Sequence, residues 1–261
     1  MMELTEITNI LYEFEPIGLD DMEGVRYMSR VDTKYPFSVS KLPLLLRSTR
    51  ALYKTLEIDQ QREFRYKTVY FDTPDLLFYN HHVTGKLNRA KVRLRTYETN
   101  GLSFLEVKQK SNKGRTSKSR IEKEPGDMNH FQQSQEFLTE LISANANTLK
   151  AVINSGFTRI TLVNLSNAER ITIDYNICWN NLRGDCVKMP FLAIAEIKSE
   201  KSTSLSPFFQ ELKHLGIRST GFSKYAMGMA LVNGVSKQND LKPKFLLINR
   251  IRDEYNANSF A

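Results

Sequence analysis

The sequence predicts an α+β fold in which about eight mostly antiparallel strands close into a β-barrel with a charged lumen and helices packed outside. Three short segments carry the main evidence: Lys91-Val-Arg-Leu-Arg95, Glu106-Val-Lys108 and Glu196-Ile-Lys198. Successive side chains of a strand point to opposite faces, so the charged residues at i and i+2 share one face and the apolar residues share the other. Turn signals between such segments and amphipathic stretches around them complete the prediction.

The first part of the chain predicts two helices and two strands. In order, we expect a helix over 3–14, a strand over 25–36, a helix over 40–53, a strand over 66–72, and a short helical or looped stretch over 74–85. Ile7, Ile10 and Leu11 fall on one helical face. Pro43 lies in the first turn of its helix, where the missing N–H is tolerated. Residues 66–72 are rich in aromatic and β-branched side chains, which favour strands.

The rest of the chain predicts most of the sheet. We expect strands at 89–99, 102–110, 115–124, 157–165, 169–179 and 191–200, helices at 127–154, 205–215 and 222–233, and a basic, weakly amphipathic tail from 242. Asn100-Gly101 is a strong hairpin signal between the first two of these strands. No linker or repeat interrupts the pattern, so we expect one domain over 1–261, with a core at about 24–233 and a basic tail over 234–261.

The charged strand face has two possible environments. It could face solvent, as one side of many antiparallel sheets does. The flanking amphipathic helices, however, need an apolar sheet face to pack on, and the residues between the charges supply one. Closing the sheet with the charges inside also removes its edges. The pattern therefore favours the inward orientation, with the solvent-facing sheet as the alternative.

Composition limits the classes of function. The chain has 261 residues, 41% of them hydrophobic, and a formal net charge of +8, so it can form a core and favours an anionic partner. Its two cysteines, Cys178 and Cys186, are too few for a disulfide framework, which predicts a reducing, cytoplasmic location. The first residues lack the pattern of a signal peptide, and no apolar run predicts a membrane span. A separate membrane protein could still be a partner.

Several chemistries lack their motifs. The chain has neither a Walker nor a Rossmann glycine pattern, no G-x-S-x-G, and no zinc spacing around its four histidines. Nucleic acid is not expected as a partner, because the basic strands lack exposed aromatic residues for base stacking. Glu106, Glu122 and Glu196 would also repel a bare phosphate backbone. These carboxylates are useful if a divalent cation bridges them to phosphates.

Seven segments in order resemble one known family. They are Arg30-x-Asp-x-Lys34-Tyr35, Val69-Tyr-Phe-Asp72-Thr-Pro-Asp75, Arg93-Leu-Arg95, Leu105-Glu-Val-Lys108, Arg170-Ile-Thr-Ile-Asp174, Ala195-Glu-Ile-Lys198 and Gly221-Phe-Ser-Lys224-Tyr225. Together they resemble the VTC (vacuolar transporter chaperone) domain, a branch of the triphosphate tunnel metalloenzymes. The resemblance implies an eight-stranded antiparallel tunnel and a triphosphate or polyphosphate substrate, with Mn²⁺ or Mg²⁺ as cofactor.

The resemblance also assigns roles to residues. Those expected to bind substrate phosphates are Arg30, Lys34, Arg93, Arg95, Lys108, Lys118, Arg120 and Lys198. Those expected to act in catalysis are Arg159, Arg170 and Lys224. Glu196 is the expected metal ligand, with Glu106, Glu122 and Asp174 as further metal-binding or orienting candidates.

The function implied by the resemblance is phosphoryl transfer, in particular polyphosphate synthesis from ATP. ATP or inorganic polyphosphate would be the ligand. Relatives that hydrolyse tripolyphosphate or nucleoside triphosphates make hydrolysis an alternative, and a non-catalytic polyphosphate- or nucleotide-binding module is another. The basic tail, with Lys242, Lys244, Arg250 and Arg252, could contact nucleic acid, although a helix packed on the barrel is the stronger expectation.

Overall fold

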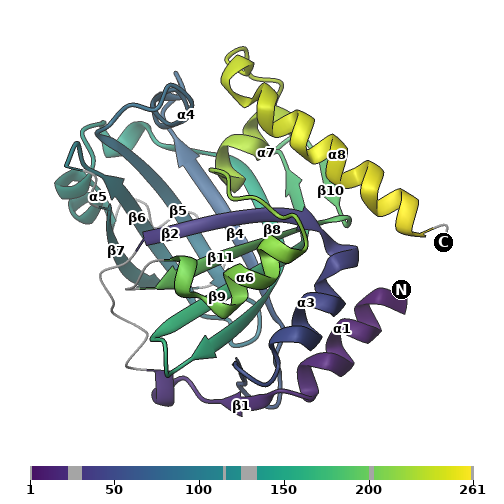
Figure 1. Ribbon diagram of the computed structural model, residues 1–261. Coiled ribbons are helices and arrows are strands. Elements are labelled where there is room, and N and C mark those ends of the chain that lie inside the picture. Colours follow the sequence, from purple (N-terminus) through teal and green to yellow (C-terminus); the bar gives the residue numbers. More distant parts are fainter. Residues whose placement is uncertain (1, 23–30, 114–115, 125–133, 200–202, 260–261) are drawn as a thin grey trace.

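The fold is built on one large, strongly curved antiparallel sheet (Figure 1). The computed structural model describes residues 2–22, 31–113, 116–124, 134–199 and 203–259. The strands are β1 (Glu15–Ile17), β2 (Val31–Ser38), β3 (Lys54–Leu56), β4 (Phe64–Asp72), β5 (Arg89–Tyr97), β6 (Ser103–Lys110), β7 (Thr116–Lys123), β8 (Lys150–Asn164), β9 (Glu169–Asn180), β10 (Cys186–Met189) and β11 (Leu192–Ser199). The main path runs β2-β11-β9-β8-β4-β5-β6-β7, and every neighbouring pair along it is antiparallel.

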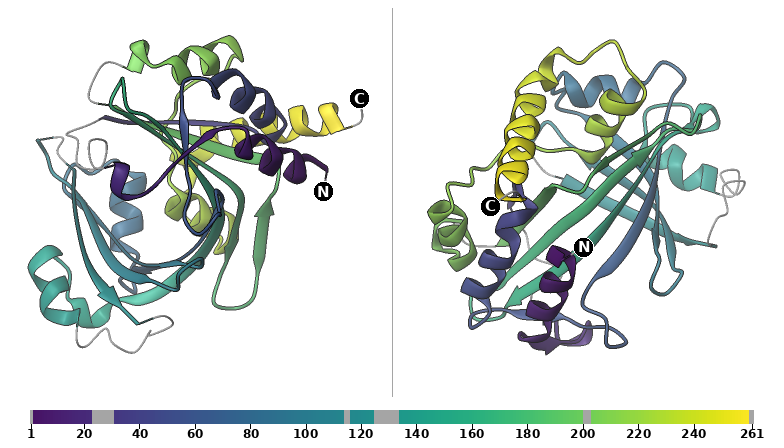
Figure 2. Two further views of the ribbon diagram at one scale, coloured as in Figure 1. Left: turned by 90° about the horizontal axis from the view of Figure 1, so that it is seen from below. Right: turned by 90° about the vertical axis from the view of Figure 1, so that its right-hand side faces the viewer.

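The sheet curls without closing through hydrogen bonds. Among the described residues, β2 and β7 end the path and do not pair with each other. Register shifts near Tyr70 in β4 and Gly156 in β8 mark irregularities of the kind that bend strands. The curled strands are seen in Figure 2, left. The α+β class and the antiparallel sheet are confirmed, whereas the predicted hydrogen-bonded closure into a barrel is not.

Helices cover the outside of the sheet and one end of its concave face. They are α1 (Met2–Tyr12), α3 (Leu42–Thr49), α4 (Leu77–Val83), α5 (Gln135–Leu141), α6 (Pro207–His214), α7 (Lys224–Val232) and α8 (Lys242–Ser259). Helices α1, α3 and α6 share one apolar cluster with β2, β8, β9 and β11, and α5 shares another with β4, β5 and β6. No helix within the described ranges is long and apolar enough to cross a membrane.

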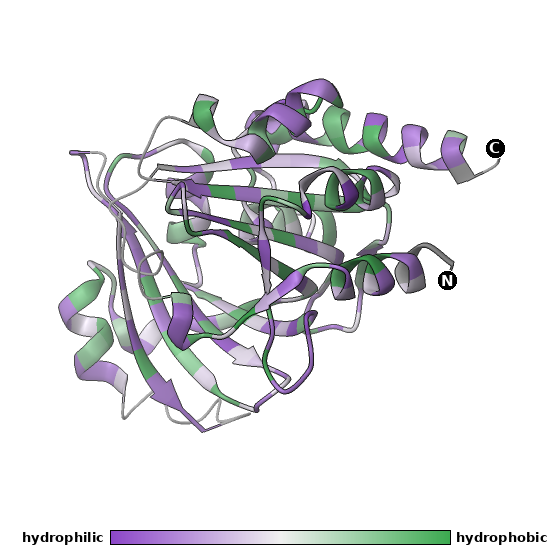
Figure 3. Ribbon diagram, turned by 60° about the horizontal axis from the view of Figure 1, so that its bottom comes forward, coloured by the Kyte–Doolittle hydropathy of each residue, from purple (hydrophilic) through white to green (hydrophobic). Residues whose placement is uncertain are grey.

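Alternation along the strands creates the two faces. In β11, Ala193, Ala195 and Ile197 pack against the outer helices, so Glu196 and Lys198 turn to the opposite, concave face. The same alternation of hydrophobic and hydrophilic residues is visible along the strands in Figure 3. The sequence-based assignment of these faces is confirmed.

The structure corrects the prediction for 127–154. Within residues 134–154 the α-helix is α5 alone, with a 3-10 turn at Ala146–Thr148, and the part of the prediction over 127–133 lies outside the described residues. The end of the expected helix, from Lys150, is the first part of β8, which pairs with β4. Sheet pairing over this stretch outweighs its helix-like pattern, as tertiary context often does.

Two further differences concern small elements and the tail. The short strands β1, β3 and β10 add to the predicted sheet. The weakly amphipathic tail forms helix α8, and its Ile248 and Ile251 are buried in a cluster shared with α7. The tail helix packed on the fold is therefore the arrangement that the structure shows.

Helix α7 packs on the concave face at one end. Its Tyr225 and Met229 belong to the same cluster as Tyr70 and Ile194, which share their strand faces with Arg93 and Glu196. At Gly228 the helix lies so close to Trp179 that an added Cβ would stand 2.3 Å from the Trp179 Cδ1 atom. The absence of a side chain at this position lets α7 reach the sheet.

We expect Gly228→Ala to destabilise the protein, although alanine is intrinsically the better helix former by about 1 kcal/mol. Forcing a methyl group into a packed contact typically costs about 1–3 kcal/mol. Thermal unfolding should show a lower Tm. Gly221→Ala is the control, since no atom lies within 4 Å of its added Cβ. Equal stability of Gly228→Ala and wild type would contradict this account of the helix contact.

Candidate functional site

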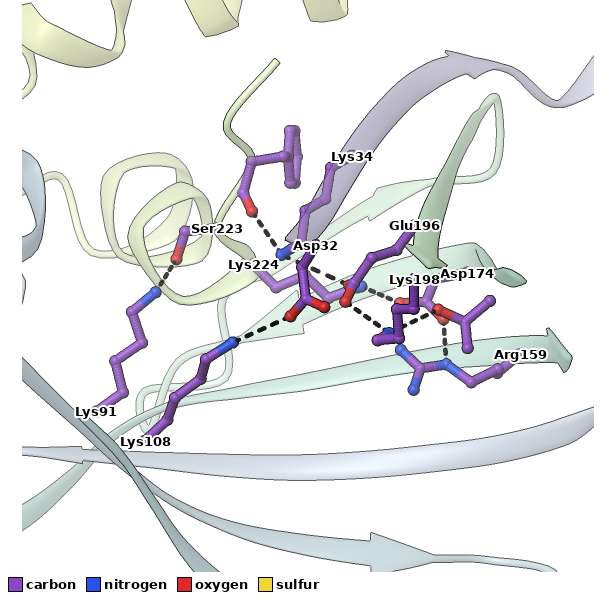
Figure 4. A network of polar contacts seen from close by, with 12 residues as sticks. Asp32, Lys34, Lys91, Lys108, Arg159, Asp174, Glu196, Lys198, Ser223 and Lys224 are labelled. Atoms are coloured by element: carbon purple, nitrogen blue, oxygen red, sulfur yellow. Dashed lines mark hydrogen bonds and ion pairs between the residues drawn. The ribbon is translucent and has the colours of Figure 1, made fainter. Parts of the chain in front are cut away.

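The concave face carries a cluster of cations and carboxylates contributed by both halves of the sheet (Figure 4). On β2 and β11, Lys34 and Glu196 are register partners. Glu196 forms ion pairs with Lys198 at 2.5 Å and with Lys34 at 3.9 Å. Burial would raise the pKa of Glu196, but attraction to Lys198 and Lys34 outweighs it and holds the pKa well below the usual range. Glu196 is therefore a half-buried, ionised carboxylate among lysines.

A second ion-pair group joins β8, β9 and α7. The Nε and Nη2 atoms of Arg159 donate to Asp174 at 2.6 and 2.8 Å, and Lys224 Nζ donates to the same carboxylate. Arg159 and Lys224 together overcome desolvation and keep the pKa of Asp174 below its usual range. Arg159 also lies over the rings of Tyr66 and Phe157, at 5.1 and 5.3 Å from their centroids. The aromatic rings and Asp174 together fix the plane of the guanidinium.

The third group lies on β5, β6 and β7. Glu106 is only 1% exposed, accepts a hydrogen bond from Arg93 Nε at 2.7 Å and forms an ion pair with Lys118. Burial opposes its ionisation, but Arg93, Arg95 and Lys118 lower its pKa to about 2. Glu106 therefore compensates cations that would otherwise repel one another.

Arg95 is a buried cation with an unsatisfied hydrogen-bond donor among the described residues. It is 7% exposed and lies over Tyr66 at 5.4 Å and Phe157 at 5.9 Å. Its Nε atom finds no hydrogen-bond acceptor within the described part of the chain. Desolvation and the charge of Arg93 lower its pKa. Since burying an unsatisfied charged donor is expensive, Arg95 is poised to gain from a bound anion.

Side-chain contacts bridge the two halves of the curled sheet. Lys108 Nζ on β6 lies 3.8 Å from Asp32 Oδ2 on β2. Lys91 on β5 donates to Ser223 Oγ at 3.0 Å, and Lys34 donates to the carbonyl of Phe222 at 3.0 Å. Strand β2 at one end of the hydrogen-bonded path therefore meets β6 near the other end through side chains, and the segment before α7 contacts both β2 and β5, as Figure 4 shows.

The structure brings together most of the predicted residues. Those in the three ion-pair groups and their bridge are Lys34, Arg93, Arg95, Lys108, Lys118, Arg159, Lys198, Lys224, Glu106, Asp174 and Glu196. Arg170 lies beside Lys198 in register, on the same face. Arg30 lies outside the described residues.

Two predicted residues lie toward the rim. Arg120 is exposed and stands over the Phe104 ring at 4.6 Å. Glu122 is also exposed and pairs in register with Phe104, so it shares the charged face but stands apart from Glu196. Their proposed roles in phosphate and metal binding remain predictions.

Four residues of this face were not predicted as site residues. Lys91 and Asp32 were present in the patterned segments, at i−2 from Arg93 and Lys34, and that spacing could have included them. Tyr66 and Phe157 gave no such signal. Their role depends on the pairing of β4 with β8, which brings the two rings into a stack at 5.2 Å.

Metal binding by this face would need oxygen ligands beyond the protein. The described residues contain no group of three or more His, Cys, Asp or Glu side chains able to hold an ion. Asp174 and Glu106 are each held by two cations. Glu196 is paired with Lys198 and Lys34 in the same way, but it differs in having a second carboxylate, Asp32, that acts on the same lysines, Lys198 and Lys108. This donor set fits Mg²⁺ or a similar hard cation, which commonly binds one or two carboxylates and completes its shell with substrate phosphates.

The lowered pKa values of three lysines on this face predict that the protein takes up protons when an anion binds. Burial lowers the pKa of Lys118, Lys198 and Lys224 to about 8 each, despite carboxylate partners that raise it. A phosphate anion beside them favours the charged form. At pH 9 we expect tripolyphosphate binding to draw protons onto these lysines, whereas at pH 6 they are already charged.

Calorimetry in buffers of different ionisation enthalpy measures this uptake. Lys118→Met is the matched variant, because titration of the ligand itself is the same in both proteins. We expect smaller uptake at pH 9 in the variant than in wild type. The same uptake in both proteins would show that Lys118 does not titrate on binding.

The model of the VTC domain matches residues 29–233. A search of curated proteins gives no match. Similar solved structures include a "putative adenylate cyclase" from Bacillus halodurans, at 16% identity and TM-score 0.48, covering 75% of this chain and 96% of that one.

Two more solved structures are similar to the chain. A "putative adenylate cyclase" from Vibrio parahaemolyticus has 14% identity and TM-score 0.45, covering 77% of this chain and 99% of that one. A Hippeastrum protein described with a dominant triphosphatase activity has 13% identity and TM-score 0.44, covering 77% and 95%. The family match extends over most of the sequence and includes β2 through α7, and on this ground the chain belongs to the VTC domain family.

Proposed function

We propose that the protein is a metal-dependent phosphotransferase acting on triphosphate or polyphosphate, and that its reaction is polyphosphate synthesis from ATP. One observation carries the proposal: the cations that gather on the concave face outnumber the carboxylates that compensate them. Arg95 is the clearest example of this excess of positive charge, because its Nε lacks an acceptor among the described residues.

The arrangement suits a chain of phosphates better than a single anion. Arg93 and Arg95 extend from β5, Arg159 from β8 and Lys198 from β11, so cations surround the concave face from both halves of the sheet. Guanidinium groups bind phosphate oxygens in bidentate fashion. Phosphoryl transfer depends mainly on positioning and on stabilising charge spread over several oxygens. Fixed cations on several sides supply both.

A divalent ion would be held by Glu196 and Asp32. When bound, such an ion neutralises phosphate oxygens and helps to align the substrate. The protein residues contribute separately: Arg93, Arg95 and Lys118 grip phosphates from the β5–β7 side, while Arg159 stabilises charge that develops during transfer.

The carboxylates are poor candidates for general bases. Attraction to neighbouring cations lowers the pKa values of Glu106, Asp174 and Glu196. A base that activates water works best with a pKa near the working pH. A phosphate oxygen is already anionic and needs no such base. This supports attack by a phosphate on ATP, with the nucleoside diphosphate leaving, over hydrolysis by water.

Incubation of the purified protein with ATP and Mn²⁺ or Mg²⁺ tests the proposal. Gel staining for polyphosphate and an assay for phosphate release, run on the same sample, distinguish the outcomes. Polymer formation supports the polymerase. Phosphate release without polymer would identify a hydrolase, and tight binding without turnover would identify a binding module.

We expect Arg95→Met to weaken tripolyphosphate binding about tenfold or more, because a charge-assisted contact contributes roughly 1.5–3 kcal/mol. Methionine keeps much of the packing between Tyr66 and Phe157 while removing the charge. Calorimetry measures the dissociation constant. Arg47→Met is the control, since Arg47 is exposed and pairs with Glu6 outside the sheet. A loss no larger than that of the control would remove Arg95 from the phosphate site.

Glu196→Gln should abolish most metal-dependent turnover, because it removes the ligand charge with little change in shape. Binding of Mn²⁺ in the presence of tripolyphosphate, followed by electron paramagnetic resonance, should weaken in parallel. The control is Glu63→Gln, a carboxylate bonded to Thr8 and Tyr175 on the outer side. Wild-type metal binding and turnover in Glu196→Gln would falsify its role as a metal ligand.

A further inference from the structure

Asp72 is a fully buried carboxylate that does not belong to the cation cluster. It is 0% exposed and ends β4. Its Oδ1 accepts from the backbone N–H groups of Thr73 at 2.8 Å and Phe78 at 2.9 Å. Its Oδ2 accepts from the N–H of Tyr79 at 2.9 Å and from the hydroxyl of Tyr225. None of these donors is a lysine or arginine side chain, so the carboxylate depends on each donor being in place.

Tyr225 connects this carboxylate to the candidate site. It directly follows Lys224 at the start of α7. Its ring stacks on Tyr70 at a centroid distance of 5.1 Å and meets the edge of Tyr79 at 6.3 Å. Two aromatic neighbours and one hydrogen bond therefore fix both the position and the rotation of this side chain.

The backbone at Lys224 is held from the other side. Trp179 Nε1 donates to the carbonyl of Lys224 at 2.8 Å. The side chain of Lys224 then extends to Asp174 and over the Phe157 ring, with Nζ 4.4 Å from its centroid. Hydrogen bonds to Asp72 of β4 and from Trp179 of β9 therefore hold the first turn of α7, and the Lys224 side chain extends from that turn.

We propose that Asp72, acting through the hydroxyl of Tyr225, is a positioning pair that sets where the Lys224 ammonium lies among the cations. Lysine has a flexible four-carbon stem and a compact charge, so its own side chain does not fix the location of that charge. A displacement of about 1 Å at a reacting group can lower a rate by about a hundredfold. The proposal rests on the proposed function, because it assigns Lys224 a part in turnover.

The Asp72–Tyr225 pair has a matched counterpart elsewhere in the core. Tyr53 donates its hydroxyl to Glu169, another fully buried carboxylate, near the start of α6 and away from the cation cluster. Tyr225→Phe and Tyr53→Phe each remove one buried tyrosine–carboxylate hydrogen bond while keeping the ring. A general loss of stability affects both variants, whereas loss of Lys224 positioning affects only one.

Steady-state kinetics with ATP and Mn²⁺ compare the two variants. We expect kcat of Tyr225→Phe to fall about tenfold or more, with KM changed by less than about twofold. Tyr53→Phe should keep kcat within about twofold of wild type, at a similar loss in Tm. A kcat for Tyr225→Phe no lower than that of Tyr53→Phe would overturn the proposal.

A double-mutant cycle tests whether the effect passes through Lys224. In the Lys224→Ala background, removal of the Tyr225 hydroxyl should lower kcat by less than about twofold, because the positioned group is gone. A full additional loss in that background would show that Tyr225 acts by another route and would overturn the proposal.

A crystal structure of Tyr225→Phe separates this proposal from the proposed function. If wild type shows no turnover, the proposed function fails, but the structure still decides the positioning role. We expect the first turn of α7 to shift and Lys224 Nζ to leave Asp174. An unmoved turn with the Lys224–Asp174 contact intact would overturn the positioning pair.

Discussion

The rest of this structure depends on how like charges are buried together. Desolvation of several lysines and arginines on one concave face is unfavourable, and their mutual repulsion adds to it. A few carboxylates offset this cost, and each is shared by two cations. Glu106 pairs with Arg93 and Lys118, and Asp174 pairs with Arg159 and Lys224. Carboxylates in such pairs stay ionised and orient the cations. The excess positive charge that remains defines the chemistry of the face.

The apolar side of the same strands makes this concentration of charge possible. Outer helices bury alternate residues of β2, β8, β9 and β11 in a core that contains no part of the cation cluster. That packing supplies stability from apolar burial, at roughly 25 cal/mol per Å². The residues of the polar face can then favour binding over stability, as residues at functional sites commonly do.

The strand alternation was the part of the fold most accessible to sequence analysis. Lys91, Arg93 and Arg95 share a face for the same geometric reason that Glu196 and Lys198 do, and that rule needs no tertiary information. The helix expected over 127–154 failed because Lys150 and the residues after it pair with β4, a contact between segments distant in sequence.

The same limit applies within the site. The stacking of Arg95 and Arg159 on Tyr66 and Phe157 follows from the β4–β8 register. The contact between Asp32 and Lys108 follows from the curl of the whole sheet. Neither arrangement has a local sequence signal. Residue types and faces could be predicted, whereas partners across the concave side could not.

Because the hydrogen-bonded path of strands is open, side chains and not paired backbones bound part of the interior. Between β2 and β6 the described contact is made by side chains, Lys108 with Asp32, and Lys34 of β2 reaches the carbonyl of Phe222 just before α7. Backbone ladders hold a fixed spacing of about 4.8 Å, but lysine stems can bend and their ion pairs weaken as salt rises. The width of the interior is therefore an elastic quantity, sensitive to ionic strength and to any anion that competes for these ammonium groups. It can change without the rupture of a single strand pair.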